Sequence, residues 1–463
     1  MEELLKVILI IVILIIIITV YKITIIRKRN PNRPIIACYL DILISSARFI
    51  NMGKWGKDND ILAALKDAIK EFKYKITDLG GKDNGERMIQ KYNITRKLGL
   101  ERSEAKYTPL GSYISLISLT ERMKTRLGLV DYFKKHQSVE KINVGKPVFI
   151  TGFPRTGTTF LHELLGLHPN VRMHYTWEQM DPIPRTKDES KEAHLKDRKV
   201  RYNASKNRLS LLLGLVGDEI QSIHRIGYDD SEECTIPCAM ELPLNLFELP
   251  LMVYAADEII NIGAGETYDF YKKYLQLLTW QTGTSDDDFT WMLKCPFHLP
   301  YLKELADAFP GSTVVWTHRN PTECIASACS LYETILGMVM EKSSINKIAL
   351  GKAVMNYSEL AMKKAIEAIP LVSSKIKIEH VKYTDSVKIP KETCKRIAEA
   401  ANLGFSDAYD SKITAYLQKN AAEREKLKAR NKSEKELHSY SLEEYGLSKK
   451  IIDEKFAFYK SYY

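Results

Sequence analysis

The chain has 463 residues, of which 45% are hydrophobic and 27% charged, proportions that are typical of globular proteins and exclude wholesale disorder. Its 23 glycines and 17 prolines exclude collagen-like and low-complexity classes. The net charge of +10 suits an anionic ligand or a membrane surface, but it falls short of the dense basic surface of a nucleic-acid binder, so no nucleic-acid partner is expected.

An apolar segment of membrane-spanning length lies near the N-terminus. Leu4–Ile26 is mostly Leu, Ile and Val, and Val7–Tyr21 carries no charge. A span needs about 20 mostly apolar residues, and the amines of Lys6 and Lys22 can extend to the two interfaces. No small-residue cleavage site follows the segment, which argues against a removed signal peptide. We therefore expect residues 1–30 to form a single-pass membrane anchor and its basic flank.

Charges on either side of this segment predict its orientation. Arg27, Lys28 and Arg29 follow the segment, whereas Glu2 and Glu3 precede it. The positive-inside rule therefore places the large C-terminal part in the cytosol. Sequons for N-glycosylation would instead fit a Golgi or ER lumen, and they occur at Asn93, Asn203, Asn356 and Asn431.

Two regions with different patterns follow the anchor. Residues 31–140 are expected to be mainly helical, because Asp60–Lys73 and Ser115–Phe133 place apolar residues at helical spacing. In residues 141–463, short apolar runs alternate with helical stretches, which is typical of an α/β domain with a parallel sheet. A helical insertion is expected at 178–285. The four predicted strands are PVFIT, FTWMLK, TVVWTH and KIEHVKY.

The strongest local signal is the segment VFITGFPRTGTTF, Val148–Phe160. An apolar strand leads into a loop with Gly152 and Gly157, and a helix is expected to begin at Thr158. Backbone N–H groups of such a loop and of the helix N-terminus form a cradle for an anion. The glycine spacing matches nucleotide P-loops, but Thr158 replaces their lysine, and the positive charge lies inside the loop at Arg155. The pattern disfavours the alternative of a P-loop nucleotide kinase or NTPase.

Two motifs together resemble those of sulfotransferases that use 3′-phosphoadenosine-5′-phosphosulfate (PAPS). The run PRTGTT resembles their 5′-phosphosulfate loop. Their second signature, a strand followed by Arg and then by Ser eight residues later, matches TVVWTHRNPTECIAS with Arg319 and Ser327. Pro321 is expected in the first turn of the next helix with Asn320 as its N-cap. One bound 3′-phosphate can then contact both Arg319 and Ser327.

The resemblance covers roughly residues 95–460 and implies both a fold and an activity. The implied fold is a P-loop-type α/β fold with a parallel sheet flanked by helices. The implied activity is transfer of a sulfuryl group from PAPS to an acceptor hydroxyl or amine, without a metal ion. The segments WMLKCPFHLPYLKELADAFPG, YTDSVKIPKETCKRIAEAANL and HSYSLEEYGLS also resemble the family. The Gly-x-x-Gly-x-Lys loop of cytosolic sulfotransferases is absent, so no C-terminal contact to the 3′-phosphate is assigned.

The resemblance also implies a set of donor-binding residues. Arg155 is expected to stabilise the leaving phosphate, because a fixed cation favours the charge that develops there. Thr158 and Thr159 are expected to bind the 5′-phosphate through their hydroxyl and N–H groups. The full predicted donor site consists of Gly152, Arg155, Thr156, Gly157, Thr158, Thr159, Arg319 and Ser327.

Two residues are candidates for the general base. Glu178 follows the loop helix near the position of the catalytic Glu of protein-tyrosine sulfotransferases, with a two-residue gap. His298, in KCPFHLP, resembles the His of the Lys-Thr-His-Leu-Pro segment of cytosolic sulfotransferases, also displaced by two residues. Lys294 matches the Lys of that segment and is expected near the sulfuryl group. The predicted catalytic residues are therefore Arg155, Glu178, Lys294 and His298, although an isolated Glu or His is more often structural.

The expected acceptor is a small molecule, a lipid or a glycan. Met240–Ala255 is apolar except for Glu241 and Glu248, and it forms either a lipophilic acceptor pocket or a core helix. A membrane-tethered relative that binds nucleotide without catalysis is a further alternative, which retention of Arg155 and Arg319 disfavours. The seven cysteines show neither a disulfide framework nor zinc spacing, so buried thiols and no metal site are expected.

Overall fold

A five-stranded sheet with the strand order β2-β3-β1-β4-β5 forms the centre of the computed structural model. The structure describes residues 2–49, 82–217, 220–221, 226–282, 289–430 and 441–462. Every neighbouring pair of strands is parallel, which confirms the predicted α/β fold. Four strands are those predicted from the sequence, and the short β2 was not predicted. The strands are β1 Val148–Gly152, β2 Val171–Arg172, β3 Thr290–Lys294, β4 Thr313–His318 and β5 Lys377–Lys382.

The two faces of the sheet bury separate groups of apolar side chains. Along β1, Val148 and Ile150 pack on one face and Phe149 on the other, because successive side chains of a strand alternate. Burial on both faces explains why the three central strands, β1, β3 and β4, are mostly apolar. The first face is covered by α6 (Thr158–Gly166), α18 (Pro390–Ala400) and α19 (Asp407–Arg430). The second is covered by α13 (Thr267–Trp280), α14 (Leu302–Ala308), α15 (Pro321–Val339) and α16 (Lys347–Val372).

The remaining helices precede the sheet, fill the insertion before β3, or follow β5. As predicted, the described part of the N-terminal region is helical, whereas the predicted helix Asp60–Lys73 lies outside the described residues. Before the sheet lie α4 (Lys82–Ser103) and α5 (Pro109–Lys135). The insertion contains α7 (Thr176–Met180), α8 (Lys191–Val216), α10 (Thr235–Cys238), α11 (Leu249–Met252) and α12 (Ala256–Ile262) in addition to α13. After β5 come α17 (Tyr383–Lys388) and α20 (Lys449–Lys455).

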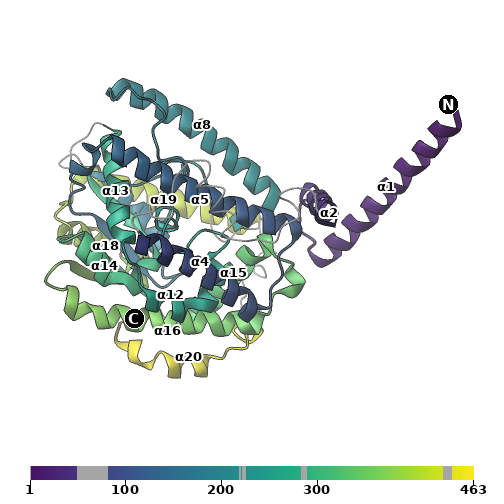
Figure 1. Ribbon diagram of the computed structural model, residues 1–463. Helices are drawn as coiled ribbons and strands as arrows, with labels where there is room; N and C mark the ends of the chain where they lie inside the picture. The colour runs from purple at the N-terminus through teal and green to yellow at the C-terminus, as the bar shows by residue number, and fades with distance from the viewer. Residues whose placement is uncertain are drawn as a thin grey trace.

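The helix α1 (Glu2–Arg29) projects away from the rest of the molecule (Figure 1). Its segment Ile10–Arg29 is long and apolar enough to cross a membrane, and none of it is buried inside the protein. A signal sequence shares these properties. The last turn of α1 is basic, with Arg27, Lys28 and Arg29.

The next helix, α2 (Ile35–Phe49), is held against the first turn of α5 by a buried polar cluster. Asp41 forms an ion pair with Arg33 at 2.7 Å and accepts a hydrogen bond from the backbone N–H of Leu110 at 2.7 Å. Arg33 also donates to the hydroxyl of Thr108, the N-cap of α5. Removing one partner of a buried ion pair is strongly destabilising, so this cluster fixes the start of α2 relative to α5.

All seven cysteines are buried free thiols, as the sequence predicts. Burial raises the pKa of each thiol above its usual value. The reactive form of cysteine is the thiolate, so none of these residues offers a reactive thiol at the surface near neutral pH.

Candidate active site

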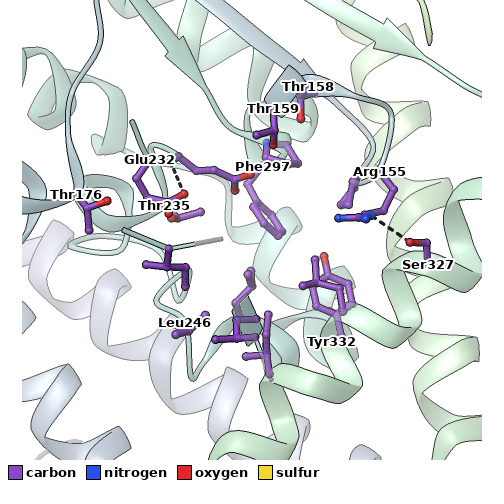
Figure 2. A pocket seen from close by; sticks show the side chains of 18 of the residues that line it. Arg155, Thr158, Thr159, Thr176, Glu232, Thr235, Leu246, Phe297, Ser327 and Tyr332 are labelled. Atoms are coloured by element: carbon purple, nitrogen blue, oxygen red, sulfur yellow. Dashed lines mark hydrogen bonds between the residues drawn. The ribbon is translucent and has the colours of Figure 1, made fainter. Parts of the chain in front are cut away.

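A cavity of about 860 Å³ lies at the carboxyl ends of β1 and β4, where parallel α/β sheets commonly bind ligands. Its lining divides into a polar part, next to the loop after β1, and an apolar part between α8 and α15. Figure 2 shows Thr158, Thr159 and Arg155 on the polar side and Leu246 and Tyr332 on the apolar side. The polar part is lined by Arg155, Gly157, Thr158, Thr159, Arg319, Ser327 and Tyr383.

The loop after β1 has a backbone that favours glycine at three positions. Gly152 has a φ of 152° and Gly157 a φ of 85°. A Cβ on Gly152 would lie 2.3 Å from the hydroxyl of Thr317 on β4, so a larger residue does not fit there. Arg155 also has a positive φ, 73°, which costs a non-glycine residue about 1–2 kcal/mol. The loop therefore holds Arg155 in a strained conformation.

Thr156 stabilises this loop from within. Its hydroxyl donates to the backbone carbonyl of Phe153 at 2.7 Å and lies 2.7 Å from the hydroxyl of Thr317. Thr317 donates in turn to the carbonyl of Thr151. Thr156 and Gly152 were predicted to bind the donor, but neither lines the cavity, and Thr156 is only 1% exposed. The structure supports a role for both residues in shaping the loop.

The two motifs of the sequence meet at Arg155. Its Nε donates to the hydroxyl of Ser327 on α15 at 3.0 Å (Figure 2). The guanidinium of Arg319 donates to the backbone carbonyl of Arg155 at 3.1 Å and to a carboxylate oxygen of Glu323 at 2.9 Å. The structure therefore brings Arg155, Arg319 and Ser327 into one cluster. Arg319 both supports the strained residue and is paired with a carboxylate on the helix that follows it, α15.

Two helices begin beside the polar part, as the sequence predicts. α6 begins at Thr158, directly after Gly157, and both Thr158 and Thr159 line the cavity. α15 begins at Pro321, and the side chain of its N-cap Asn320 accepts a hydrogen bond from a first-turn N–H. Unpaired N–H groups and the helix dipole favour negative charge at such ends. The polar part is therefore suited to an anion with several oxygen atoms.

Tyr383, which sequence reasoning did not single out as a site residue, forms the wall opposite this loop. Its ring centroid lies 4.1 Å from the guanidinium carbon of Arg319, a cation–π contact. A Cβ on Gly157 would lie 2.8 Å from the same ring, which explains glycine at that position. Val387 and Leu417 continue the lining beyond Tyr383.

Three of the four predicted catalytic residues, Glu178, His298 and Lys294, do not line the cavity. Glu178 is completely buried, and its carboxylate pairs with Arg172 and Arg198, each at 2.9 Å. His298 is also buried, with its Nδ1 2.9 Å from the hydroxyl of Tyr268, and burial lowers the pKa of this histidine to about 3. The carboxylate of Glu178 therefore belongs to an internal ion-pair cluster, and the imidazole of His298 to the core.

Besides Glu323 and Glu425, two neighbouring glutamates line the cavity, Glu232 and Glu233. The buried amine of the predicted Lys294 pairs with Glu233 at 2.8 Å; burial lowers the pKa of Lys294, but Glu233 and Glu232 outweigh that effect and raise it. Figure 2 shows Glu232 across the cavity from Arg155, with Phe297 between them. Sequence reasoning missed both glutamates. The acidic run DDSEE was the available signal, but its position opposite the phosphate loop depends on how the insertion folds.

The apolar part is lined by α8, α15 and the segment between α10 and α11. Four residues of Met240–Ala255 line it, while others, such as Leu251, are fully buried in the core. Arg122 of α5 also reaches this part. Its Nε is buried without a hydrogen-bond partner among the described residues, and burial lowers the pKa of its guanidinium. The apolar lining consists of Leu209, Leu212, Leu213, Ile220, Ile226, Ile236, Leu244, Leu246, Phe247, Leu249, Phe297, Leu331, Tyr332, Ile335 and Met338.

These groups are suited to a transfer reaction between an anionic and a protic substrate. Guanidinium, hydroxyl and N–H groups face one side of the space, and a carboxylate faces it from the other. Within the described ranges, no three His, Cys, Asp or Glu side chains gather in an arrangement suited to a metal ion. The chain itself therefore offers cationic, hydrogen-bonding and basic groups for chemistry at this site.

Comparisons with known proteins agree on one class. Residues 147–407 match the model of a family described as the sulfotransferase family. The sulfotransferase STF1 from Mycobacterium tuberculosis superposes with a TM-score of 0.63 at 24% identity, over 86% of this chain and 98% of that one. The sulfotransferase STF9 from Mycobacterium avium superposes with a TM-score of 0.66 at 22% identity, over 87% of this chain and 96% of that one. A search of curated proteins finds no match.

Proposed function

The chain belongs to the sulfotransferase family, and on that premise we propose that it transfers a sulfuryl group from PAPS to a hydroxyl or amine of its acceptor. The observation that carries the proposal is the cluster of Arg155, Arg319 and Ser327 beside the N-terminus of α6. Two cations from separate motifs and a helix N-terminus match a ligand with phosphate groups at both its 3′ and 5′ positions.

In this proposal the donor lies along the polar part. Gly157, Thr158 and Thr159 bind the 5′-phosphate through backbone N–H and hydroxyl groups, while Arg319 and Ser327 bind the 3′-phosphate. Glu323 is exchanged for that phosphate as the partner of Arg319. The adenine base extends past Tyr383 toward Val387 and Leu417, which line the cavity beyond that ring.

Transfer then forms a bond between sulfur and the acceptor oxygen or nitrogen and breaks the bond between sulfur and the bridging oxygen of the donor. The electron pair of the broken bond remains on the leaving 3′-phosphoadenosine-5′-phosphate (PAP), whose developing charge Arg155 stabilises. The acceptor proton moves to a carboxylate. We assign this role to Glu232, because it lines the cavity across from Arg155, whereas Glu178 and His298 do not line it.

Donor recognition is tested by titrating the full chain with PAP, AMP and ATP in a calorimeter. Arg319→Ala should weaken PAP binding about tenfold to a hundredfold, the value of one charge-assisted contact, and should weaken AMP binding much less. Ser327→Ala should act in the same direction more weakly. Glu323→Gln, the matched control, breaks the same ion pair but keeps the cation and should not weaken PAP. Equal losses for PAP and AMP, or preference for ATP, would contradict the assignment.

The base is tested by comparing Glu232→Gln with Glu178→Gln. Loss of a general base lowers turnover by about 10²–10⁴, so Glu232→Gln should do so while PAP affinity stays unchanged. Glu178→Gln should mainly lower stability, because it leaves Arg172 and Arg198 without their shared carboxylate. Normal turnover in Glu232→Gln would remove this residue from the mechanism.

We also propose that α1 anchors the enzyme in a membrane, with the catalytic part in the cytosol. The apolar length of α1 and its basic last turn support this arrangement. Extraction with carbonate should leave the full chain in the membrane fraction. Release by carbonate would contradict the anchor, and a glycan on Asn203 or Asn356 would contradict the cytosolic orientation.

A further inference from the structure

The apolar part of the cavity has a lining of aliphatic and aromatic side chains that a small polar acceptor does not require. Two helices on opposite sides line it, with Leu209 and Leu212 on α8 and Ile335 and Met338 on α15. Leu246 adds a third wall (Figure 2). Binding in a space lined in this way becomes more favourable with each methylene group of the ligand that is removed from water.

The helix that lines this part also leads to the anchor. α8 ends at Val216, and Gly217 lies beside the junction of α1 and α2: a Cβ on Gly217 would be 3.7 Å from the ring of Pro34. Leu213, which lines the cavity, is one helical turn earlier. Figure 1 shows α8 running toward this junction. The apolar part therefore lies about one turn of helix from the junction of α1 and α2.

The surface at the junction has the character of a membrane-facing surface. α2 exposes four apolar side chains along one stripe, Ile35, Ile36, Tyr39 and Leu43, which are 43–60% exposed. Its opposite face is buried against the protein. Next to the basic end of α1, an amphipathic helix of this kind suits the interface of a bilayer.

We propose that the acceptor is a long-chain amphiphile with a terminal hydroxyl, taken directly from the bilayer that holds α1. Its hydrocarbon chain occupies the apolar part between α8 and α15, and its hydroxyl lies at the end of the cavity that Glu232 and Arg155 line. This inference rests on the proposed sulfotransferase activity and specifies its substrate class.

The first test measures transfer to primary alcohols from butanol to dodecanol, with the full chain reconstituted in phosphatidylcholine vesicles. Leu212→Gln and Leu246→Gln each place an amide against the bound chain. They should lower the rate on dodecanol about tenfold or more relative to the rate on butanol. Leu211→Gln is the matched control, because Leu211 is 66% exposed on the same helix. Partition of the alcohols into the vesicles is the same for all variants, so it does not affect the comparison.

The outcomes separate the inference from the function on which it rests. Equal losses on butanol and dodecanol, or no loss in either variant, would overturn the long-chain acceptor and leave the transferase intact. Binding of PAP without transfer to any of these alcohols would overturn it as well. Absence of PAP binding would instead overturn the proposed function.

A second arm tests the source of the acceptor. Octadecanol, which exchanges slowly between vesicles, is placed either in the vesicles that contain the protein or in separate vesicles. Transfer should occur in the shared vesicles and be at least tenfold slower with separate ones. Equal rates would refute uptake from the bilayer in which the protein is anchored.

Discussion

Arg155 combines backbone strain with a proposed catalytic charge, and two substitutions separate these properties. Glycine removes the cost of the positive φ, which is about 1–2 kcal/mol. Its greater conformational freedom in the unfolded chain cancels about 0.5–1 kcal/mol of that gain in stability. The free energy of unfolding of Arg155→Gly should therefore be about 0.5–1 kcal/mol higher than that of Arg155→Ala. Both variants lose the guanidinium and its bond to Ser327. Turnover should fall in both by about 10²–10³, as when one oxyanion-stabilising donor is removed.

Urea denaturation measures the stability difference, and initial transfer rates at saturating PAPS measure turnover. Asn402 provides the matched control, because its φ is also positive, 57°, and it does not line the cavity. Asn402→Gly and Asn402→Ala should show the same stability difference with unchanged turnover. Unchanged turnover in Arg155→Gly would refute the catalytic role. A stability difference at Asn402 but none at Arg155 would refute the strain.

Four further predictions follow from the described contacts. Thr156→Val should lower the free energy of unfolding by about 1–3 kcal/mol in urea, because it removes the hydroxyl that bonds Phe153; an unchanged midpoint would contradict the internal role of Thr156. Glu178→Ala should cost about 3–5 kcal/mol by leaving Arg172 and Arg198 unpaired, while the PAP affinity of the folded fraction stays constant; a large loss of affinity at normal stability would contradict it. Gly157→Ala should abolish PAP binding in calorimetry, since the new methyl group meets the ring of Tyr383, and Tyr383→Ala should partly restore it. Burial lowers the pKa of His162, His174, His298 and His318 to about 3, below the unfolded value of about 6.5, so unfolding binds protons. Stability should therefore be fully present above about pH 6.5 and decline as the pH falls toward 3, and a urea midpoint that does not change between neutral pH and about pH 5 would contradict this.

Most of the fold could be predicted from the sequence, because the patterns that specify its strands and the anion loop are local. The buried strands β1, β3 and β4 are mostly apolar runs, and the anion loop with its following helix is specified by a few adjacent residues. The largely exposed β5 follows from its place in the alternation of strands and helices, so β1, β3, β4, β5 and the start of α15 were predicted correctly. The exception, β2, has only two residues, Val171 and Arg172, which is too short for a periodic pattern. The spacing of Arg319 and Ser327 placed both residues at the site but did not reveal that Ser327 bonds Arg155.

The second substrate's side of the site was harder to predict. Glu232, Glu233 and Arg122 reach the cavity from segments far apart in the sequence, and no local pattern specifies such proximity. Glu178 and His298 were selected because of their positions relative to family motifs. Each lies two residues from the position of its counterpart in the family motif. In the structure, however, Glu178 is paired with two arginines and His298 packs against two aromatic rings. Sequence position indicated the neighbourhood of these residues but not the direction of their side chains.

The burial of every cysteine gives the protein a surface that does not react with thiol reagents. A maleimide that cannot cross membranes should leave the intact chain unlabelled, so a single cysteine introduced by Asn32→Cys would be the sole target. Its labelling in sealed vesicles would report directly on which side of the bilayer the catalytic part lies. The same burial means that mild oxidants meet no exposed cysteine sulfur on the folded protein.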